Sequence, residues 1–272
     1  MKKLPLSIGI LSWKGYTSLE NSLLSYKING LNDFVSEKYI CLPEYNEEGI
    51  QLSKKFGYKP LLFKKNLGIL KGFKELAKTM PDGPLLLLEN DLPLIDSKKE
   101  TFQQLARSIE LLYSKNVAQV RLRSRKNPGV PFHAIEKYKR YWDETNSSKI
   151  RKFIRPFKAK KLIGTSVYVS DEPHFLHPNY ISDLSDGFFS VSSKVMNWSN
   201  LAILVDKNFF LNVIIKEAEN TYSSNNVNGF KNIEIELNNS LHERKVSYEQ
   251  SDWGSVVGIM WMYGYWVLII PI

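Results

Sequence analysis

Two carboxylates follow a run of four leucines in the first half of the chain. Leu85 to Leu88 form an uninterrupted apolar stretch, and Glu89 and Asp91 come directly after it. Such a run is typical of a central strand covered on both faces, and open α/β sheets bind ligands at the carboxyl ends of their strands. Two oxygen ligands at this spacing suit a hard cation such as Mg²⁺ or Mn²⁺. The pattern predicts a divalent-metal site; the alternative is that Asp91 simply caps the segment before Pro93.

A second pattern places cations at regular intervals. Arg121, Arg123 and Arg125 alternate, so that on a strand they would share one face and repel one another unless an anion lay between them. They open a basic block, residues 121–161, with 14 basic and 3 acidic residues, a net charge of +11, whereas the rest of the chain carries −2. Aromatic residues are interleaved with these cations, which suits a phosphate or a membrane surface. The alternative interpretation is that the basic block is an insertion exposed to solvent and binds no ligand.

Strand and helix patterns alternate through the first 122 residues and would position these groups. Strands are expected over 6–11, 38–42, 60–63, 85–88 and 117–122, and helices over 17–26, 47–56, 68–80 and 97–113. This order predicts an α/β fold, a single domain with a mostly parallel, Rossmann-like central sheet flanked by helices. Further on, a strand is expected over 162–169, a loop over 174–182, a helix over 208–219 and short segments over 233–237 and 245–248.

Composition narrows the class of protein. The 272 residues carry a net charge of +9, and 43% are apolar, which is too many for a disordered chain. Cys41 is the single cysteine, so no intrachain disulfide forms.

The short apolar run after the basic start is not expected to be a signal peptide, which favours a cytoplasmic protein. The last twenty residues, 253–272, are uncharged but interrupted by Gly and Pro; a buried or interfacial segment is expected, with a tail anchor as the alternative.

Several short motifs occur in a fixed order between residues 6 and 95. They are Ser12-Trp13, Ser18-Leu19-x-x-Ser22-Leu23-x-Ser25-Tyr26, Glu44, Asn66-Leu67-Gly68-Ile69 and Glu89-Asn90-Asp91. In this order and spacing the sequence resembles the nucleotide-sugar glycosyltransferases of the GT-A fold, particularly the family-2-like group. In those enzymes a D-x-D-type motif after the fourth strand holds a divalent cation against the diphosphate of the sugar nucleotide.

The resemblance implies roles for individual residues. Residues 1–95 would form the nucleotide-sugar-binding half and residues 96–272 the acceptor-binding half, with Glu89 and Asp91 holding Mn²⁺ or Mg²⁺. The nucleotide-sugar-binding residues would be Ser12, Trp13, Glu44, Asn66, Gly68, Lys71 and Asn90. Core packing is the competing interpretation for Trp13, and a plain helix N-cap is the competing interpretation for Asn66.

The second half supplies candidates for the acceptor side. Trp198 and Asn200 look like the acceptor-facing segment of related transferases, and the three arginines are candidates for acceptor or phosphate contacts. The candidates for the acid that deprotonates an acceptor hydroxyl are Asp186 and Asp252, with Asp183 and Glu249 as alternatives. For each of these four, an ordinary loop acid is the competing interpretation.

The function expected from these patterns is transfer of a sugar from a UDP- or GDP-linked donor to a glycan or lipid-linked acceptor, dependent on a divalent cation. Peripheral contact with a membrane is an option, and no nucleic-acid partner is expected. One alternative is a sugar-nucleotide nucleotidyltransferase, although residues 12–15, Ser-Trp-Lys-Gly, are not the Gly- and Arg-rich loop usual in that class. The other is a nucleic-acid-binding protein that uses the basic block.

Overall fold

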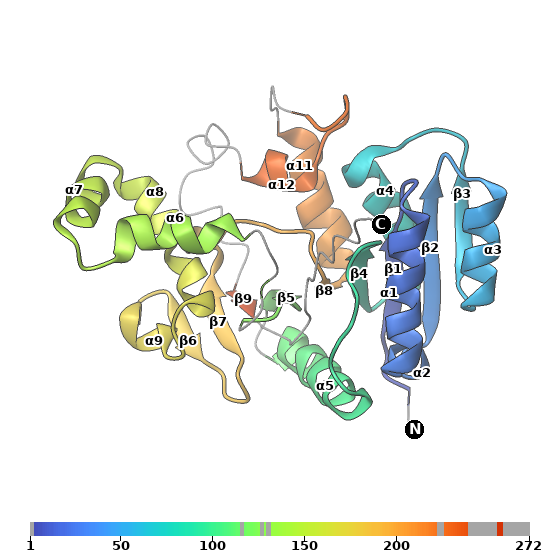
Figure 1. Ribbon diagram of the computed structural model, residues 1–272, viewed down its shortest axis with the longest axis horizontal. Helices are drawn as coiled ribbons and strands as arrows, with labels where there is room; N and C mark the ends of the chain where they lie inside the picture. Colours follow the sequence, from blue (N-terminus) through green and yellow to red (C-terminus); the bar gives the residue numbers. More distant parts are fainter. Residues whose placement is uncertain are drawn as a thin grey trace, which may run out of the picture.

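One mixed sheet runs through the molecule. The computed structural model describes residues 3–114, 117–125, 128, 132–221, 226–238 and 255–257. Within these residues the strand order is β3-β2-β1-β4-β8-β5-β9-β7-β6 (Figure 1). The strands are β1 (Ser7–Leu11), β2 (Glu37–Pro43), β3 (Lys59–Phe63), β4 (Pro84–Glu89), β5 (Val117–Arg121), β6 (Ile181–Asp183), β7 (Phe189–Ser192), β8 (Ile203–Asp206) and β9 (Ser255–Val257).

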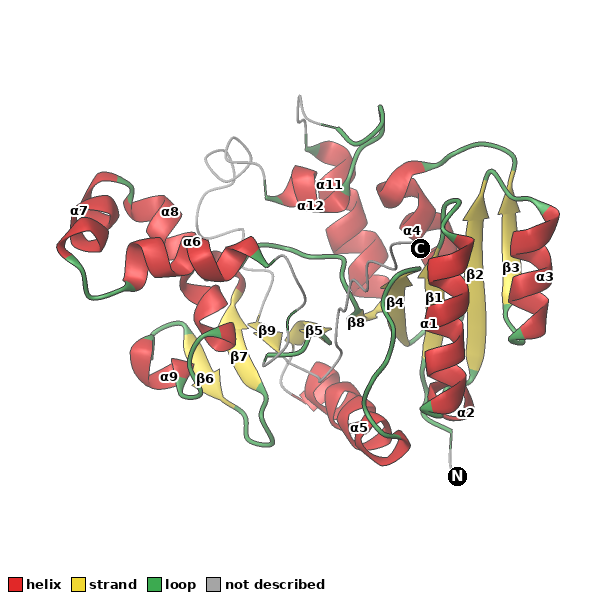
Figure 2. Ribbon diagram, in the orientation of Figure 1, coloured by secondary structure: helices red, strands yellow, loops and turns green. Residues whose placement is uncertain are grey.

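Helices pack on this sheet, and Figure 2 shows α1 in front of the strands of the N-terminal part. The helices are α1 (Tyr16–Ile28), α2 (Leu31–Phe34), α3 (Glu47–Lys55), α4 (Gly68–Thr79), α5 (Lys98–Ser114), α6 (His133–Trp142), α7 (Asn146–Ile154), α8 (Pro156–Lys161), α9 (Pro173–Leu176), α10 (Lys207–Phe209), α11 (Lys216–Asn220) and α12 (Ile233–Leu237), with the short helices η1 (Ile163–Tyr168), η2 (Ser193–Val195) and η3 (Phe210–Ile215). The predicted α/β architecture, a central sheet flanked by helices, is confirmed.

The four strands β3, β2, β1 and β4 are all parallel. Leu11 at the end of β1 pairs with Cys41 of β2 on one side and with Glu89 of β4 on the other. Because the strands run in the same direction and end at nearly the same level, the loops that follow them begin at one edge of the sheet. This is the edge where α/β proteins bind ligands.

The leucine run of β4 packs into two separate cores. Leu86 and Leu88 lie in a buried cluster with residues of α1 and α5, whereas Leu85 and Leu87 lie in a second cluster with residues of α4 and η3. Successive side chains of a strand point to opposite faces, so a strand covered on both sides is apolar throughout. The prediction of a central, doubly covered strand is therefore confirmed.

Beyond β4 the sheet departs from a simple parallel order. β8 comes from the second half of the chain and lies antiparallel between β4 and β5. The prediction of a strand over 162–169 is wrong, because Ile163–Tyr168 form a 3₁₀ helix. The expected helix over 208–219 is present as α10, the π-helix η3 and α11 in succession, and 233–237 is a helix. Residues 245–248 lie outside the described residues, as does 253–272 apart from β9.

The basic block folds into the helices α6, α7 and α8, which lie at the opposite end of the molecule from β3 (Figure 1). In the described part of the chain no helix combines the length and the apolar character needed to cross a bilayer. The division into halves at residue 95 stays a prediction. β8 and η3, which come after residue 95, pack with β4, which comes before it, in one core.

Candidate active site

A pocket of about 180 Å³ lies at the carboxyl ends of β1, β2 and β4. We call it the sheet-edge pocket. Its walls include five residues assigned to the donor site from sequence: Trp13, Asn66, Gly68, Glu89 and Asn90. The other lining residues are Leu11, Pro43, Ile69, Val227, Asn228 and Phe230. The structure therefore brings side chains from several separate loops to one small cavity at the edge where the parallel strands end.

The loops after β1 and β2 are joined beside this pocket. Nε1 of Trp13 donates a hydrogen bond of 2.8 Å to Oε2 of Glu44, and Nζ of Lys14 lies 2.9 Å from the same oxygen. These two contacts, that from Trp13 first, hold the pKa of Glu44 below its ordinary value. Trp13 is 41% exposed, so it is not a core residue. Its indole presents a flat apolar face, which suits stacking on a base.

The loop before α4 is shaped by Asn66 and Gly68. Oδ1 of Asn66 accepts a hydrogen bond of 2.9 Å from the backbone N–H of Gly68, so Asn66 fixes the turn that leads into the helix. Gly68 has φ of +67°, and a Cβ built on it would lie 2.4 Å from Cβ of Phe230. Only glycine accepts both this conformation and this contact. The first turn of α4 is thereby exposed to the pocket through Gly68 and Ile69.

A tight hairpin that the sequence analysis missed forms another wall of the pocket. Val227 and Phe230 exchange two backbone hydrogen bonds of 2.9 Å. Between them Asn228 and Gly229 both have positive φ, +51° and +82°, which is the type I′ turn for which Asn-Gly is the preferred sequence. The Asn-Gly pair was the signal that could have revealed it. Each arm of the hairpin pairs through a single residue, Val227 or Phe230, so the segment has no alternating apolar pattern that would indicate a hairpin.

One face of α1 holds the acidic loop that follows β4. Ser22, Ser25, Tyr26 and Asn29 follow one another at helical spacing and so share a face. Ser22 Oγ donates to the carbonyl of residue 90 at 3.0 Å, and Tyr26 OH donates to the carbonyl of residue 92 at 2.6 Å. At residue 94, the carbonyl accepts from Asn29 Nδ2 at 2.7 Å and the N–H donates to Ser25 Oγ at 2.8 Å. These bonds fix the backbone on which the predicted metal ligands lie. The motif on the first helix therefore has a structural role.

The carboxylates at the end of β4 lie in an unfavourable electrostatic setting. Burial, and then the neighbouring Asp91 and Glu234, raise the pKa of Glu89 to about 7. Burial also raises the pKa of Asp91, whose Oδ1 is buried and has no hydrogen-bond partner among the described residues. Asn90, between them, donates from Nδ2 to the carbonyl of Gly15 at 3.1 Å. Acids that are buried close together without a counter-charge favour the binding of a cation.

These donors fit a divalent cation that arrives with a phosphorylated ligand. In the described part of the chain no three His, Cys, Asp or Glu side chains are grouped so that they could hold a metal ion. Glu89 and Asp91 supply two carboxylates, and Mg²⁺ in such sites takes one or two carboxylates and completes its shell with phosphate oxygens and water. The pair therefore matches a metal shared with a substrate better than a permanent structural metal.

A second pocket, of about 210 Å³, is lined among the described residues by four cations and no acid. We call it the basic pocket, and its charged lining residues are Arg121, Arg123, Lys137 and Lys161. Arg121 is buried, which lowers its pKa; one Nη donates to the carbonyl of residue 197, while Nε has no partner among the described residues. A buried guanidinium with an unused donor, beside three further cations, is suited to an anionic ligand.

The two pockets are electrostatically connected through Glu234. Its Oε1 accepts hydrogen bonds from Ser199 Oγ at 3.0 Å and from the backbone N–H of Asn200 at 2.7 Å. The charge of Glu234 contributes to the raised pKa of Glu89 and opposes the lowering of the pKa of Arg121 by burial. Glu234 thus lies close enough to act on both pockets, and the sequence analysis did not single it out.

Three residues predicted for the acceptor side have structural contacts. The strand ends at Arg121, so the expectation that three arginines share one strand face is wrong. Arg125 turns away and donates to the carbonyls of residues 167 and 170 at 2.7 and 2.6 Å. Asn200 is buried and accepts the indole N–H of Trp198 at 2.9 Å, so its side chain is occupied. Trp198 contributes to the basic pocket and to the core behind it.

Of the residues predicted for the donor and metal sites, Ser12, Glu44, Lys71 and Asp91 do not line the sheet-edge pocket. Ser12 is fully buried, and its Oγ lacks a hydrogen-bond partner among the described residues; its backbone N–H donates to the carbonyl of Cys41. Lys71 lies on the face of α4 that looks toward α11, where it lines a separate hollow with Lys74 and Glu219. Helical geometry explains the position of Lys71, because it lies two residues, or about 200° around the helix, beyond the pocket-lining Ile69.

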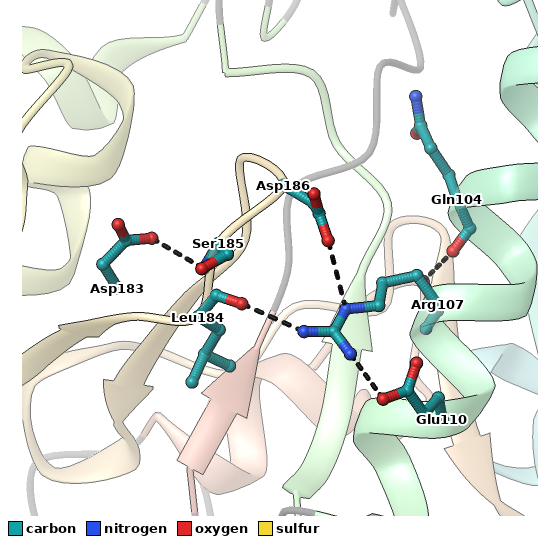
Figure 3. A network of polar contacts seen from close by, with 8 residues as sticks. Gln104, Arg107, Glu110, Asp183, Leu184, Ser185 and Asp186 are labelled. Atoms are coloured by element: carbon teal, nitrogen blue, oxygen red, sulfur yellow. Dashed lines mark hydrogen bonds and ion pairs between the residues drawn. The ribbon is translucent and has the colours of Figure 1, made fainter.

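The predicted base Asp186 is not among the residues that line the two pockets. Figure 3 shows it on the turn between β6 and β7, beside Arg107 of α5, with 3.6 Å between Asp186 Oδ2 and Arg107 Nε. Arg107 also donates to the carbonyl of Leu184 at 3.0 Å and pairs with Glu110. Asp186 lines neither pocket, and its contacts are those of a residue that fixes a turn. Asp252 and the alternative Glu249 lie outside the described residues.

No protein-family model matches the sequence, and a search of curated proteins finds no match. The fold has solved neighbours of low identity. The structure of S. aureus TarS 1-349 is 16% identical, covers 47% of this chain and 37% of its own, and has a TM-score of 0.38. Glucosyl-3-phosphoglycerate synthase from Mycobacterium tuberculosis, in complex with Mn²⁺, UDP and glucosyl-3-phosphoglycerate, is 12% identical with a TM-score of 0.38 and coverages of 57% and 52%.

A cytidylyltransferase from Leptospira borgpetersenii is 17% identical with a TM-score of 0.35, and the aligned region covers 46% of this chain and 58% of that one. This chain therefore covers less than two thirds of each of these three proteins. The neighbours are GT-A glycosyltransferases together with nucleotidyltransferases, and the likeness concerns the fold alone.

Proposed function

We propose that this protein is a glycosyltransferase that uses a nucleotide-diphosphate sugar, linked to UDP or GDP, with the help of Mn²⁺ or Mg²⁺. One observation carries the proposal: Trp13, Asn66, Gly68, Glu89 and Asn90, which follow different strands, line a single pocket at the carboxyl edge of four parallel strands. A nucleotide, a sugar and a diphosphate each need a different kind of contact. This pocket combines an aromatic face, a helix start and the carboxylate of Glu89, and Asp91 follows two residues later in the same loop.

Each group has a chemical task in the donor half. The Trp13 indole, held by Glu44, offers a surface for the base. α4 begins at Gly68 beside the pocket. Asn66 accepts the N–H of Gly68, and the remaining backbone N–H groups of the first helical turn, which have no partner within the helix, favour an anion. Glu89 and Asp91 would hold the cation, which when bound neutralises negative charge on the diphosphate leaving group. Asn90 keeps the two carboxylates in place through its bond to Gly15.

The basic pocket is proposed as the acceptor side. Arg121, Arg123 and Lys137 would bind an anionic group of a glycan or lipid-linked acceptor. Pairing of a guanidinium with a phosphate or carboxylate is strong and directional. An acceptor with a phosphate or carboxylate near the reacting hydroxyl is therefore the preferred class.

The test is turnover of a panel of UDP- and GDP-sugars in the presence of Mn²⁺, measured as release of UDP or GDP. We expect Asp91→Ala to lower turnover by about a hundredfold or more. Asp82→Ala is the matched control, since Asp82 precedes the same strand β4 at its other end, is exposed and pairs only with Lys207 among the described residues. Its turnover should equal that of the wild type.

Two results would count against the proposal. If no sugar nucleotide is bound or turned over, or if Asp91→Ala matches Asp82→Ala, the donor site is misassigned. If the protein instead joins a sugar phosphate to CTP or UTP with release of pyrophosphate, it is a nucleotidyltransferase. Product analysis by mass spectrometry distinguishes these two reactions.

A further inference from the structure

The helices of the basic block expose an apolar stripe. Ile150, Phe153 and Ile154 of α7 have exposed fractions of 58%, 88% and 66%. They are spaced as i, i+3 and i+4, so they lie on one helix face. α7 ends at Ile154, and Phe157 in the first turn of α8 is also 68% exposed. We call these four residues the α7–α8 stripe. Single exposed apolar residues are ordinary, but a contiguous row of large ones marks an interaction surface.

Cations border this stripe on both sides. Residues 146–161 contain seven Lys or Arg and no acid. Lys149, Arg151, Arg155 and Lys158 are all exposed, and helical spacing places Lys149 and Arg151 at the two borders of the stripe. A helix with large apolar residues on one face and basic residues around them is typical of segments that lie in the interface of a membrane. The long basic side chains can then reach the lipid headgroups while the apolar side chains insert.

The opposite side of these helices is used to attach them to the rest of the molecule. Ser148 is the buried residue of α7, and Trp142 at the end of α6 donates its indole N–H to the carbonyl of Ala159 in α8 at 2.9 Å. Lys152 of α7 lies over the ring of Trp142, at 4.7 Å from its centroid. The unit is thus anchored through one face and presents the stripe on another, at the end of the molecule most distant from β3 (Figure 1).

We propose that the α7–α8 stripe docks this protein on a membrane surface that contains anionic lipids. The inference goes beyond the donor and acceptor pockets and does not need them. Acidic headgroups complement the four exposed cations Lys149, Arg151, Arg155 and Lys158, and the apolar side chains gain by leaving water. A second copy is disfavoured, because a symmetric contact would bring cations of like charge together. A nucleic acid would leave Ile150, Phe153 and Ile154 without a suitable partner.

The experiment is flotation of the full chain with vesicles of phosphatidylcholine alone or mixed with phosphatidylglycerol, without nucleotide or metal. We expect binding to the mixed vesicles only, weakening as salt is raised. The double variant Phe153→Ser, Ile154→Ser should lower the partition coefficient about tenfold or more. The matched control is Leu24→Ser, Ile28→Ser, two exposed apolar residues of α1 at i and i+4, which should bind like the wild type.

All four substituted side chains are exposed, so thermal unfolding should show both variants to be folded. Several results would overturn the proposal: no binding of the wild type, equal binding of the stripe variant and the wild type, or a concentration-dependent dimer in light scattering that the stripe variant abolishes. Equal affinity for vesicles and for an oligonucleotide, unaffected by Phe153→Ser and Ile154→Ser, would show a surface that recognises charge only. Because no sugar nucleotide is present, failure of the proposed donor site would leave this test unchanged.

Discussion

The indole N–H of Trp13 donates a hydrogen bond of 2.8 Å to the carboxylate of Glu44, 31 residues further along the chain. The bond joins the loop after β1 to the loop after β2, and Lys14 adds a second contact to the same oxygen. Lys14 and Glu44 both have positive φ, +57° and +52°, a conformation that non-glycine residues seldom adopt. Such backbone strain is concentrated at functional sites, which agrees with a role for this pair in shaping the sheet-edge pocket.

Replacing Glu44 by Ala should therefore weaken donor binding without slowing the chemistry. We expect KM for the sugar nucleotide to rise about tenfold while kcat stays within about a factor of two, because the contact is the same in the ground state and the transition state. The free energy of unfolding should be nearly unchanged, since both side chains are partly exposed and solvent screens the contact. Steady-state kinetics and urea unfolding measure both. A fall in kcat at constant KM would contradict this role.

Gly68 tests whether the hairpin at Val227–Phe230 belongs to the pocket. Gly68→Ala forces a Cβ to within 2.4 Å of Phe230 at a φ of +67°, so the hairpin has to move. Gly187→Ala is the control: its φ is +79°, but no atom of the described part of the chain lies within 4 Å of the added Cβ. Both variants should lose about 1 kcal/mol to the left-handed conformation, and Gly68→Ala should lose at least about 1 kcal/mol more.

Nucleotide affinity, measured by calorimetry, should fall only for Gly68→Ala. If the two glycine variants bind the sugar nucleotide equally well, the hairpin is not part of the donor site. If they are also equally stable, Phe230 yields to the new side chain without cost.

The parallel part of the sheet could be predicted because its signals are local. The leucine run of β4 and the apolar runs of β1 and β2 are separated by helices with clear ends, and the loops after them fall at one edge for topological reasons alone. Trp13, Asn66, Gly68 and Glu89 could therefore be placed together from the sequence. The position of Lys71 could not be predicted, because the exact residue at which α4 begins decides which residues of the helix face the pocket.

The second half could not be predicted because its elements depend on distant partners. β8 is four residues long and is a strand because it completes the sheet between β4 and β5. Residues 163–168, Ile-Gly-Thr-Ser-Val-Tyr, have a strand-like composition but form a 3₁₀ helix, with Ile163 and Val167 buried in a small core beside β6 and β7. The alternation of arginines predicted that Arg125 lies on a cationic strand face. In the structure Arg125 donates instead to carbonyls 42 and 45 residues further along the chain, which no local pattern indicates.

Asp96, at the start of α5, should make stability depend on pH. It is buried, its Oδ2 has no partner among the described residues, and burial together with Glu100 raises its pKa to about 7 from an ordinary value of 3.8. Between these two values the folded protein holds a proton that the unfolded chain has lost, so stability falls as pH rises through this window. Asp96→Asn removes this dependence.

The variant should therefore gain stability relative to the wild type as the pH is raised from about 4 to above 7, by up to about 4 kcal/mol. Urea unfolding of both proteins at several pH values gives this difference, in which contributions from all other groups cancel. A difference that does not change with pH would show that Asp96 ionises as it does in the unfolded chain.

Lys137 and Lys139 separate binding of an anionic acceptor from general attraction by the basic block. Both are exposed on α6, two residues apart, but only Lys137 lines the basic pocket. Lys137→Gln should raise KM for a phosphorylated or carboxylated acceptor about five- to tenfold, whereas Lys139→Gln should leave it within about a factor of two. Donor hydrolysis without acceptor should be unchanged in both. Equal effects of the two substitutions on KM would show that the block attracts the acceptor by its overall charge, and the basic pocket would then not be the acceptor site.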